Sequence, residues 1–540
     1  MIGSALNVVN DPLDVSERRW HPRLFHIVET DDITLKNSPD AEWFDVLLKW
    51  DWKRYRELGA EYYEALYRFN QQATQRRLEA ESAMNHGNEE SKDEARQRLL
   101  FERPTAGNSQ TPILFETPVS SQPVHIDPEE IGPGKVPSRL AGKQPKCFFS
   151  LLKSFVGVTL MGHAAEPENI RRELVNNPAF ARVCGFMPAD AYGLYDQRAI
   201  PSLRKLEQFD QIMTENGLWS KCKWDEIRTN INSGLIKAER EIVHDTTHYH
   251  AYSCFEVVKY EDEKGKQQKK SQAKVGKSCG CKEKETCPHE WRLVDDGAGT
   301  VVKSANRMYW AHKASMLALP RQGVPLDAVA VTDAASHDSH TLEASLRRLF
   351  DNLPLTRDWF DYVLDDGAAY DLDLMARIEE ELGLRVRASM NPRRRPALIE
   401  DLPRGMAKLT PYGDLIRMDG HTMEYRGVRW QTDSFIYGPA LDEQQRPHCL
   451  NCLHRSGCCP HADKGRQATV HFDKLPHIQP KDPPMAKRFK AMMTRRPAVE
   501  RVIKRVKCDF GEPQLTKRGN AAFQARLDKS MIALHVLLRT

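Results

Sequence analysis

The sequence predicts an α/β protein whose strands and helices follow a helical N-terminal part, and three segments indicate this class. Residues 241–250 form a β-branched and aromatic run with the alternation of a strand. Residues 362–364 form a short apolar run, typical of a buried strand, that stops at two aspartates and a glycine before a helix-like pattern. Residues 494–507 carry apolar side chains at i, i+3, i+4 and i+7, which indicates an amphipathic helix.

Four regions are expected along the 540 residues. Residues 1–101 read as an N-terminal helical region whose cluster of aromatic residues at 62–69 is expected in a core. Residues 102–145 are rich in Pro, Ser and Gly and indicate a linker. Residues 146–236 form a second helical region, and residues 237–540 form the α/β domain, with cysteine-rich inserts at 260–300 and about 405–480.

Two predicted strands carry aspartates where an active site needs them. Asp245 lies within the first strand and precedes two threonines, whereas Asp365 and Asp366 end the later strand just before Gly367 turns the chain. A carboxylate at the C-terminal end of a buried strand, before a helix, is a common position for an active-site group. The structural alternative is that each aspartate serves a turn or caps a helix.

The helix near the C-terminus holds one acid beside two cations. Pro497 suits a first helical turn, and Arg496, Glu500 and Lys507 return to nearly the same face at spacings of four and seven. This arrangement suits a carboxylate that binds a metal and cations that hold phosphates. The alternative is a solvated basic face with a single i,i+4 ion pair.

The order Asp, Asp, Glu, with Arg and Lys on the glutamate helix, resembles the DDE transposases of bacterial insertion sequences, which have an RNase H-like catalytic core. Their signature, Tyr-x2-Arg-x3-Glu-x6-Lys, is matched at Arg496, Glu500 and Lys507, while Met493 stands where the family has the Tyr that helps to hold the transposon end. The first-aspartate motif is similar at residues 242–247. The second, Asp-x-Gly-Tyr-Asp, is similar at residues 366–371 with one extra residue.

The resemblance covers roughly residues 146–540 and ranks the candidates for the second acid. It favours Asp366, with Asp365 as the alternative. Asp333 and Asp338 are a rival pair, but they lie in the segment that resembles the third core strand and the helix after it, which precedes the second catalytic position in the family.

The resemblance also implies the chemistry and the partners. Asp245, Asp366 and Glu500 would bind Mg²⁺ or Mn²⁺ for a two-metal mechanism, since hard cations prefer oxygen ligands. The DNA-binding residues would be Arg496, Lys507, Lys504, Arg495 and Trp430. Trp430 lies in a predicted two-stranded insert; it would stack on an unpaired base or, alternatively, belong to the core of the insert. Residues 146–236 would bind transposon ends or dimerise, because such enzymes hold two DNA ends in a synaptic complex.

Seven of the 12 cysteines fall into two clusters that each end in Cys-Pro-His. Such clusters favour structural zinc with four Cys or His ligands, and disulfides are the alternative. The first cluster consists of Cys279, Cys281, Cys287 and His289, and the second of Cys449, Cys452, Cys458, Cys459 and His461. The second contains Cys-x2-Cys and lies where a subgroup of these transposases has a cysteine cluster before the glutamate. The two clusters would bind one or two zinc ions.

Charge and hydropathy limit the other function classes. The net charge is only +4, so any nucleic-acid site must rest on local basic patches at 264–277, at 393–395 and around the glutamate helix. No GxxxxGK[ST] loop occurs, which leaves an ATP-driven mechanism unsupported. Residues 148–162 are apolar but contain Lys153, so they predict a buried helix and no membrane span. Without a signal-peptide pattern, the expected place is the bacterial cytoplasm, in association with the nucleoid.

The sequence therefore predicts a DNA transposase that binds terminal inverted repeats, cuts double-stranded DNA and joins 3′-hydroxyls to target DNA. One alternative is a transposase-derived nuclease that cuts without joining. The other is a zinc-bearing DNA-binding protein without strand-transfer activity.

Overall fold

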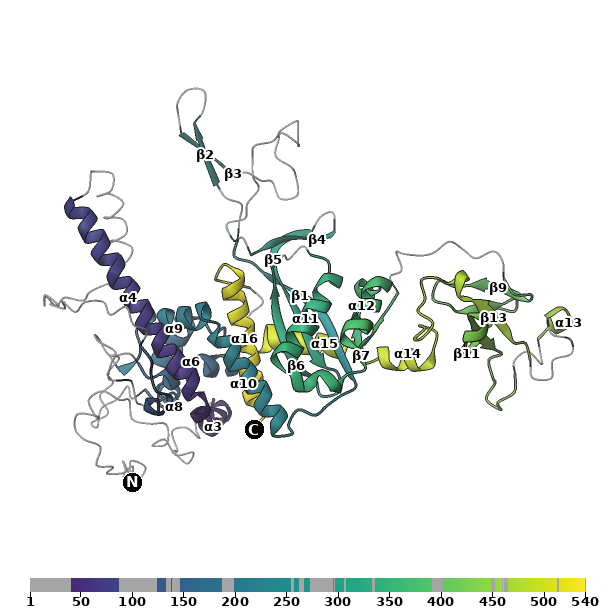
Figure 1. Ribbon diagram of the computed structural model, residues 1–540, viewed down its shortest axis with the longest axis horizontal. Helices are drawn as coiled ribbons and strands as arrows, with labels where there is room; N and C mark the ends of the chain where they lie inside the picture. Colours follow the sequence, from purple (N-terminus) through teal and green to yellow (C-terminus); the bar gives the residue numbers. More distant parts are fainter. Residues whose placement is uncertain are drawn as a thin grey trace. The chain divides into compact units, whose positions relative to one another are not determined.

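The computed structural model divides the chain into two compact units. Unit 1 comprises residues 1–226, 510–512 and 528–540, and unit 2 comprises residues 227–509 and 513–527. The structure describes residues 40–86, 124–132, 137, 146–186, 199–253, 257–261, 267–271, 295, 297–304, 307–332, 336–390, 402–447, 452–458, 460, 465–511 and 514–539. Figure 1 shows these elements coloured along the chain.

Unit 1 is helical, as the sequence predicts for both of its segments. Tyr62 and Tyr63 are buried, and the ring of Tyr62 lies 5.5 Å from that of Phe148. The apolar helix α6 is buried along its whole length, Lys153 included. The elements of this unit are α3 (Ala41–Lys49), η2 (Trp52–Tyr55), α4 (Arg56–His86), η3 (Pro128–Glu130), α6 (Phe148–Leu160), α7 (Pro167–Asn176), α8 (Pro178–Val183), α9 (Leu203–Glu215), α10 (Leu218–Asn232) and α16 (Asn520–Leu537). Two of them, α10 and α16, contribute residues to both units.

Unit 2 is built on a mixed six-stranded sheet in the order β4-β5-β1-β7-β8, with β6 also paired to β5. The strands are β1 (Glu241–His250), β4 (Gly299–Ser304), β5 (Arg307–Leu319), β6 (Val324–Val331), β7 (Tyr362–Asp365) and β8 (Arg385–Ala388). The long strand β5 is antiparallel to β1, β4 and β6, whereas β1, β7 and β8 run parallel. This sheet is compatible with the RNase H-like core that the resemblance implies, so the predicted fold class is confirmed.

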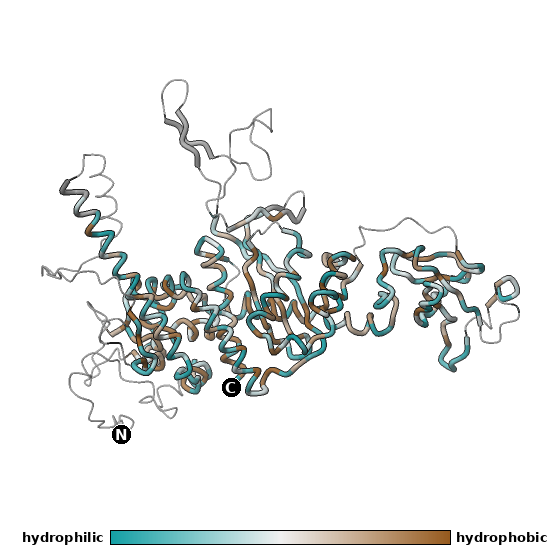
Figure 2. Tube along the Cα trace, viewed as in Figure 1, coloured by the Kyte–Doolittle hydropathy of each residue, from teal (hydrophilic) through white to brown (hydrophobic). Residues whose placement is uncertain are grey.

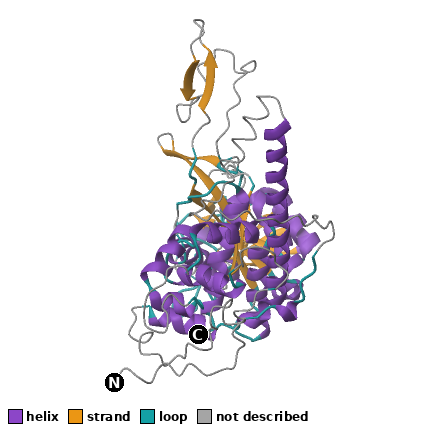
Figure 3. Ribbon diagram, turned by 90° about the vertical axis from the view of Figure 1, so that its left-hand side faces the viewer, coloured by secondary structure: helices purple, strands orange, loops and turns teal. Residues whose placement is uncertain are grey.

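Helices cover both faces of this sheet. Figure 3 colours the helices purple and the strands orange, and Figure 2 shows hydrophobic residues along the central strands. Helix α11 (Ser339–Asn352) packs on β5 and β6, and α15 (Ala498–Lys504) packs on β1 and β5. The remaining elements of this part are β2 (Val257–Glu261), β3 (Gln267–Ser271), η5 (Pro354–Trp359), η6 (Gly367–Ala369), α12 (Leu372–Leu382), α14 (Lys487–Met493) and the π-helical turn η10 (Arg505–Asp509).

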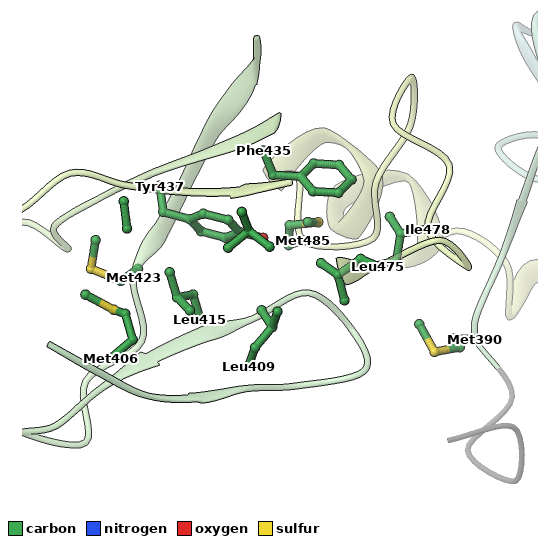
Figure 4. Close-up of a cluster of buried hydrophobic side chains, with 12 residues drawn as sticks. Met390, Met406, Leu409, Leu415, Met423, Phe435, Tyr437, Leu475, Ile478 and Met485 are labelled. Carbon is green, nitrogen blue, oxygen red and sulfur yellow. The ribbon is translucent and has the colours of Figure 1, made fainter. Parts of the chain in front are cut away.

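The insert between the second aspartate and the glutamate has its own small core. Its three-stranded sheet has the order β11-β12-β13, and a separate pair joins β9 to β10. Figure 4 shows the buried cluster, in which Leu415 and Tyr437 are completely buried. The predicted two short strands at 422–438 are therefore confirmed. The elements are β9 (Met406–Leu409), β10 (Leu415–Arg417), β11 (Glu424–Arg429), η7 (Trp430–Thr432), β12 (Ser434–Gly438), α13 (Arg455–Cys458), β13 (Ala468–His471) and η9 (Phe472–Lys474).

A buried arginine ties the chain leaving this insert back to the sheet. Arg387 of β8 has no exposed surface, and its Nε donates a 2.7 Å hydrogen bond to Asp482, with a second bond from its terminal nitrogen. The guanidinium also lies 4.1 Å from the ring centroid of Tyr362 in β7. Because Asp482 precedes α14 and α15, this ion pair helps to fix the approach of the glutamate helix to the sheet.

We expect Arg387→Ala to destabilise the protein far more than Arg377→Ala. Removing one partner of a buried ion pair leaves the other charge uncompensated, at a cost of about 3–5 kcal/mol, whereas an exposed pair contributes about 0–1 kcal/mol. Arg377 is 53% exposed and pairs with Glu343, so it is a matched control. Urea unfolding of both variants measures the difference, and equal midpoints would contradict a stabilising role for the Arg387 pair.

Candidate active site

Sheet topology brings the two predicted aspartates together. Strands β1 and β7 are parallel neighbours, and Val243 pairs with Leu364. Asp245 and Asp366 each lie two residues beyond this pair, so the chain direction carries both towards the same end of the sheet. Asp366 lies just outside β7, where its side chain accepts a 2.7 Å hydrogen bond from the amide of Ala368 at the start of η6.

The glutamate helix adds the third acid through a shared arginine. The Arg496 guanidinium lies 2.9 Å from Asp245 and 2.7 Å from Glu500, and its distance to Asp366 is 4.0 Å. These contacts join residues from three separate segments. The structure therefore brings together Asp245, Asp366, Glu500 and Arg496, four residues that the sequence singled out.

Burial perturbs the first acid. Burial raises the pKa of Asp245 to about 6, although the Arg496 guanidinium and the amide of Thr246 lower it. The side chain of Asp245 is 16% exposed, whereas those of Asp366 and Glu500 are 41% and 60% exposed. The exposure of the three acids thus increases from Asp245 on its strand to Glu500 on its helix, and the exposed side of the cluster is open to a substrate.

The donor chemistry of these acids fits divalent metal ions. Three carboxylates offer only oxygen atoms, which Mg²⁺ and Mn²⁺ prefer. The Nε atom of Arg496 is buried and has no hydrogen-bond partner within the described residues. Among the described residues, no three His, Cys, Asp or Glu side chains form a ready metal-binding group, and the Arg496 guanidinium lies among the three acids.

The adjacent acids Asp365 and Asp366 have different surroundings. Asp365 is 2% exposed and lies 2.6 Å from Nδ1 of His244, while its other oxygen accepts a hydrogen bond from the amide of Asp366. Burial lowers the pKa of His244, but the charge and hydrogen bond of Asp365, together with the charges of Asp245 and Asp338, leave it raised. Asp365 is therefore engaged in the interior, and Asp366 is the acid of this pair that faces Arg496.

Of the two rival candidates for the second catalytic acid, the structure describes Asp338 but not Asp333. Asp338 accepts a 2.7 Å hydrogen bond from Thr246 and an ion pair from Lys313. Burial raises the pKa of Asp338, but the hydrogen bonds from Lys313 and Thr246 bring this pKa below its usual value. Asp338 thus contacts Thr246, the residue after Asp245 on β1, but it forms its ion pair with Lys313. Asp333 lies outside the described residues.

The predicted DNA-binding cations point in different directions. Lys504 is exposed, whereas Arg495 donates a 2.6 Å hydrogen bond to Glu241 at the start of β1. Lys507 lies in the π-helical turn that follows α15 and contacts the hydroxyl of Thr247 and the carbonyl of His248. The predicted helix therefore extends through residue 507, but it is α-helical only from Ala498 to Lys504 and continues as a π-helical turn, from which Lys507 reaches β1.

Trp430 and the cysteines complete the predicted residues. Trp430 is 57% exposed and makes an edge contact with Phe472 at 5.8 Å, so the alternative of a core tryptophan is wrong. In the second cluster, the structure describes Cys452 and Cys458. The other ligands of that cluster, Cys449, Cys459 and His461, all of the first cluster, Cys279, Cys281, Cys287 and His289, and the basic patch at 393–395 lie outside the described residues.

Sequence reasoning missed the polar network behind the acids. His244 precedes Asp245 on β1, so its side chain points to the opposite face of the sheet. There it contacts Asp365 and Ser315. The signal available in the sequence was the pairing of a His-Asp dipeptide on one strand with an Asp-Asp dipeptide on the next, since parallel neighbours place their inward residues side by side.

Comparison with known families assigns this part of the chain. Residues 299–535 match the family model described as Transposase DDE domain. This part of the chain is a transposase DDE domain. No curated protein matches it. The matched range of the transposase contains Asp366, Arg496 and Glu500, and it begins after β1, so Asp245 is placed by the sheet rather than by the match.

No helix among the described residues of the transposase is long and apolar enough to cross a bilayer. The apolar helix α6, which the sequence predicts to be buried, is buried along its whole length.

We expect Asp245→Asn to stabilise the metal-free transposase at pH 7. A folded-state pKa of about 6, above the usual 3.8, means that charging Asp245 disfavours folding as pH rises between these values. Above pH 6 the free energy of unfolding of the variant should exceed that of the native protein by roughly 1–3 kcal/mol, since one pKa unit corresponds to about 1.4 kcal/mol. Below about pH 4 this difference should disappear.

Chemical unfolding from pH 4 to 8 in a chelating buffer measures the effect. Asp358→Asn, at an exposed acid, controls for the general loss of one negative charge. A gain that does not change with pH would contradict the assignment of the effect to desolvation of Asp245.

Proposed function

We propose that this transposase binds the terminal inverted repeats of an insertion sequence, cuts DNA at those ends and transfers the 3′-hydroxyls to target DNA. The observation that carries the proposal is the meeting of Asp245, Asp366 and Glu500 around one guanidinium. Three acids from distant segments repel one another at this partly exposed surface, and a single guanidinium compensates only one of the three charges. Convergence at such a surface is typical of a catalytic site.

Each residue has a role that follows from its contacts. Asp245 and Asp366 would bind one metal ion, and Glu500 a second. Bound divalent metals supply the activation of the attacking water or 3′-hydroxyl and the stabilisation of the leaving oxygen. Arg496, close to all three acids, would hold the phosphate next to the scissile bond, since a guanidinium binds phosphate oxygens in pairs.

Cations near the acids supply the backbone contacts to DNA. Lys504 and Arg501 are exposed on α15, and Lys507 lies beside the strand that carries Asp245. Such contacts provide affinity without reading sequence and weaken as salt is raised. The inward pairing of Arg495 with Glu241 gives it a smaller part in DNA binding than the other predicted cations.

We expect Asp366→Asn and Glu500→Gln each to abolish metal-dependent cutting and joining, by on the order of 10³-fold, because losing a metal ligand removes several kcal/mol of transition-state stabilisation. Asp373→Asn, an exposed acid in the first turn of α12, should cut and join like the native protein. The assay uses DNA carrying the element's own ends, with Mg²⁺ or Mn²⁺.

The outcomes separate the proposed function from its alternatives. Cutting without joining by the native protein would favour a transposase-derived nuclease. Binding of the ends without any cutting would favour a DNA-binding protein derived from a transposase. Full activity in Asp366→Asn alone would move the second catalytic position to Asp365 or Asp333.

Two further features of the proposal concern assembly and end binding. A homodimer in a synaptic complex would hold both ends, and the reaction would take place on DNA in the bacterial cytoplasm. The exposed Trp430 would stack on an unpaired base near the cut, since aromatic rings stack on any base. Its edge contact with Phe472 limits its freedom and lowers the entropy lost on stacking.

The second cysteine cluster would hold structural zinc. The Cys452 sulfur accepts a 3.4 Å hydrogen bond from the amide of His454. Gly405 leaves space for the sulfur of Cys458, since a β-carbon at that position would lie 2.3 Å from it. Cysteine sulfurs of this kind are the usual ligands of structural zinc.

We expect about one zinc ion per chain at the second cluster, lost in Cys452→Ser and retained in Cys508→Ser, whose cysteine is exposed and far along the chain. Metal analysis of the purified proteins measures this ratio. A zinc content that is equal in both variants would sink the assignment of Cys452 as a ligand.

A further inference from the structure

A buried polar network lies directly behind the catalytic acids. His244 is completely buried on β1, with Nδ1 2.6 Å from Asp365 and Nε2 2.8 Å from the hydroxyl of Ser315. Ser315 in turn lies 2.7 Å from Ser345 of α11, and the hydroxyl of Thr341 lies 3.4 Å from Nε2. The imidazole thus joins β1, β7, β5 and α11.

The two ends of this network are covalent neighbours of the proposed metal ligands. His244 precedes Asp245, and Asp365 precedes Asp366. Asp365 uses one oxygen for His244 and the other for the amide of Asp366, at 2.6 Å. A shift of the imidazole would therefore be transmitted to the backbone of both ligand residues, because each is one peptide unit away.

The network also prevents a second acid from competing at the site. Two adjacent aspartates at the end of β7 could each turn towards a cation. Asp365 is held in the interior by a partner that supplies a hydrogen bond, and a buried carboxylate without such a partner is strongly disfavoured. The chain therefore presents one carboxylate of this pair, that of Asp366, to the outer side.

We propose that His244 is a positioning residue that, through Asp365, fixes the separation of Asp245 and Asp366 for divalent metal binding. This inference rests on the proposed function and deepens it. Residues that orient metal ligands from behind alter metal affinity when they are changed, typically by about 10–100-fold. His244 touches neither substrate nor metal; it acts through the hydrogen bond to Asp365 and through its own peptide link to Asp245.

The test is Mn²⁺ binding by the full chain without DNA. Titration calorimetry, or electron paramagnetic resonance of free Mn²⁺, measures the affinity. His244→Leu, which removes both hydrogen bonds, should weaken Mn²⁺ binding about 10–100-fold. His244→Asn keeps a donor that can reach Asp365 and should remain within about 5-fold of the native affinity. The metal concentration at half-maximal DNA cutting should shift in parallel.

Two further variants separate positioning from stability. The double variant His244→Leu/Asp365→Leu replaces the buried pair by apolar side chains, which is often neutral for folding, so it should melt like the native protein yet bind Mn²⁺ weakly. His312→Leu is the matched control. His312 and Asp295 form an equally buried pair at 2.8 Å, and His312 lies four residues along β5 from Met316, the partner of Asp245. Its loss should lower the melting temperature without changing Mn²⁺ affinity.

Native Mn²⁺ affinity in the well-folded double variant would overturn the positioning role, as would equal losses in His244→Leu and His312→Leu. These results would leave the proposed function intact if the native protein still cuts and joins DNA. Absence of both Mn²⁺ binding and DNA cutting in the native protein would instead overturn the proposed function and this inference together.

Discussion

The arrangement of the acidic cluster depends on the compensation of negative charge by Arg496. Asp245 is largely buried, and its raised pKa shows that the interior disfavours its ionised form. The guanidinium offsets this by contacts with Asp245 and Glu500, and it lies within ion-pair range of Asp366. A planar group with several donors can serve acids on different elements at once, which a lysine ammonium on a flexible stem does less well.

The strand order determines which residues this cation can reach. Parallel pairing of β1 with β7 places the two aspartates at one end of the sheet, and antiparallel β5 on the other side of β1 carries Ser315 and Lys313 towards the same strand. Alternation along β1 then separates two environments. Odd-numbered Asp245 and Thr247 face α15 and its π-helical turn, while even-numbered His244 and Thr246 face α11 and Asp338.

Much of this could be predicted from the sequence because the decisive signals are local. The strand ending at Asp365, the amphipathic stripe on α15 and the two short strands on either side of Trp430 each follow from the pattern of a few neighbouring residues. The fold class follows from the order of such segments. The end of α15 was not predictable in this way, because a π-helical turn after Lys504 has no marker comparable to a glycine or a proline.

The buried polar contacts were beyond sequence reasoning for a different reason. Whether His244 meets Asp365, or Arg387 meets Asp482, depends on which strands become neighbours and in what register. A shift of one residue would turn each of these side chains to the other face. The distinction between Asp365 and Asp366 likewise required knowing which of the two follows the strand into the interior.

The ion pair between Arg387 and Asp482 gives the insert the properties of a closed loop. These two residues are 95 positions apart, and the small sheet and all of its core cluster except Met485 lie between them. The entropy of closing a loop grows only with the logarithm of its length, by about 0.6 kcal/mol for each doubling. Evolution could therefore lengthen, shorten or replace this segment at little cost to the sheet, provided that the two ends still meet. The position is a natural place for lineages to acquire new modules while the acids stay where they are.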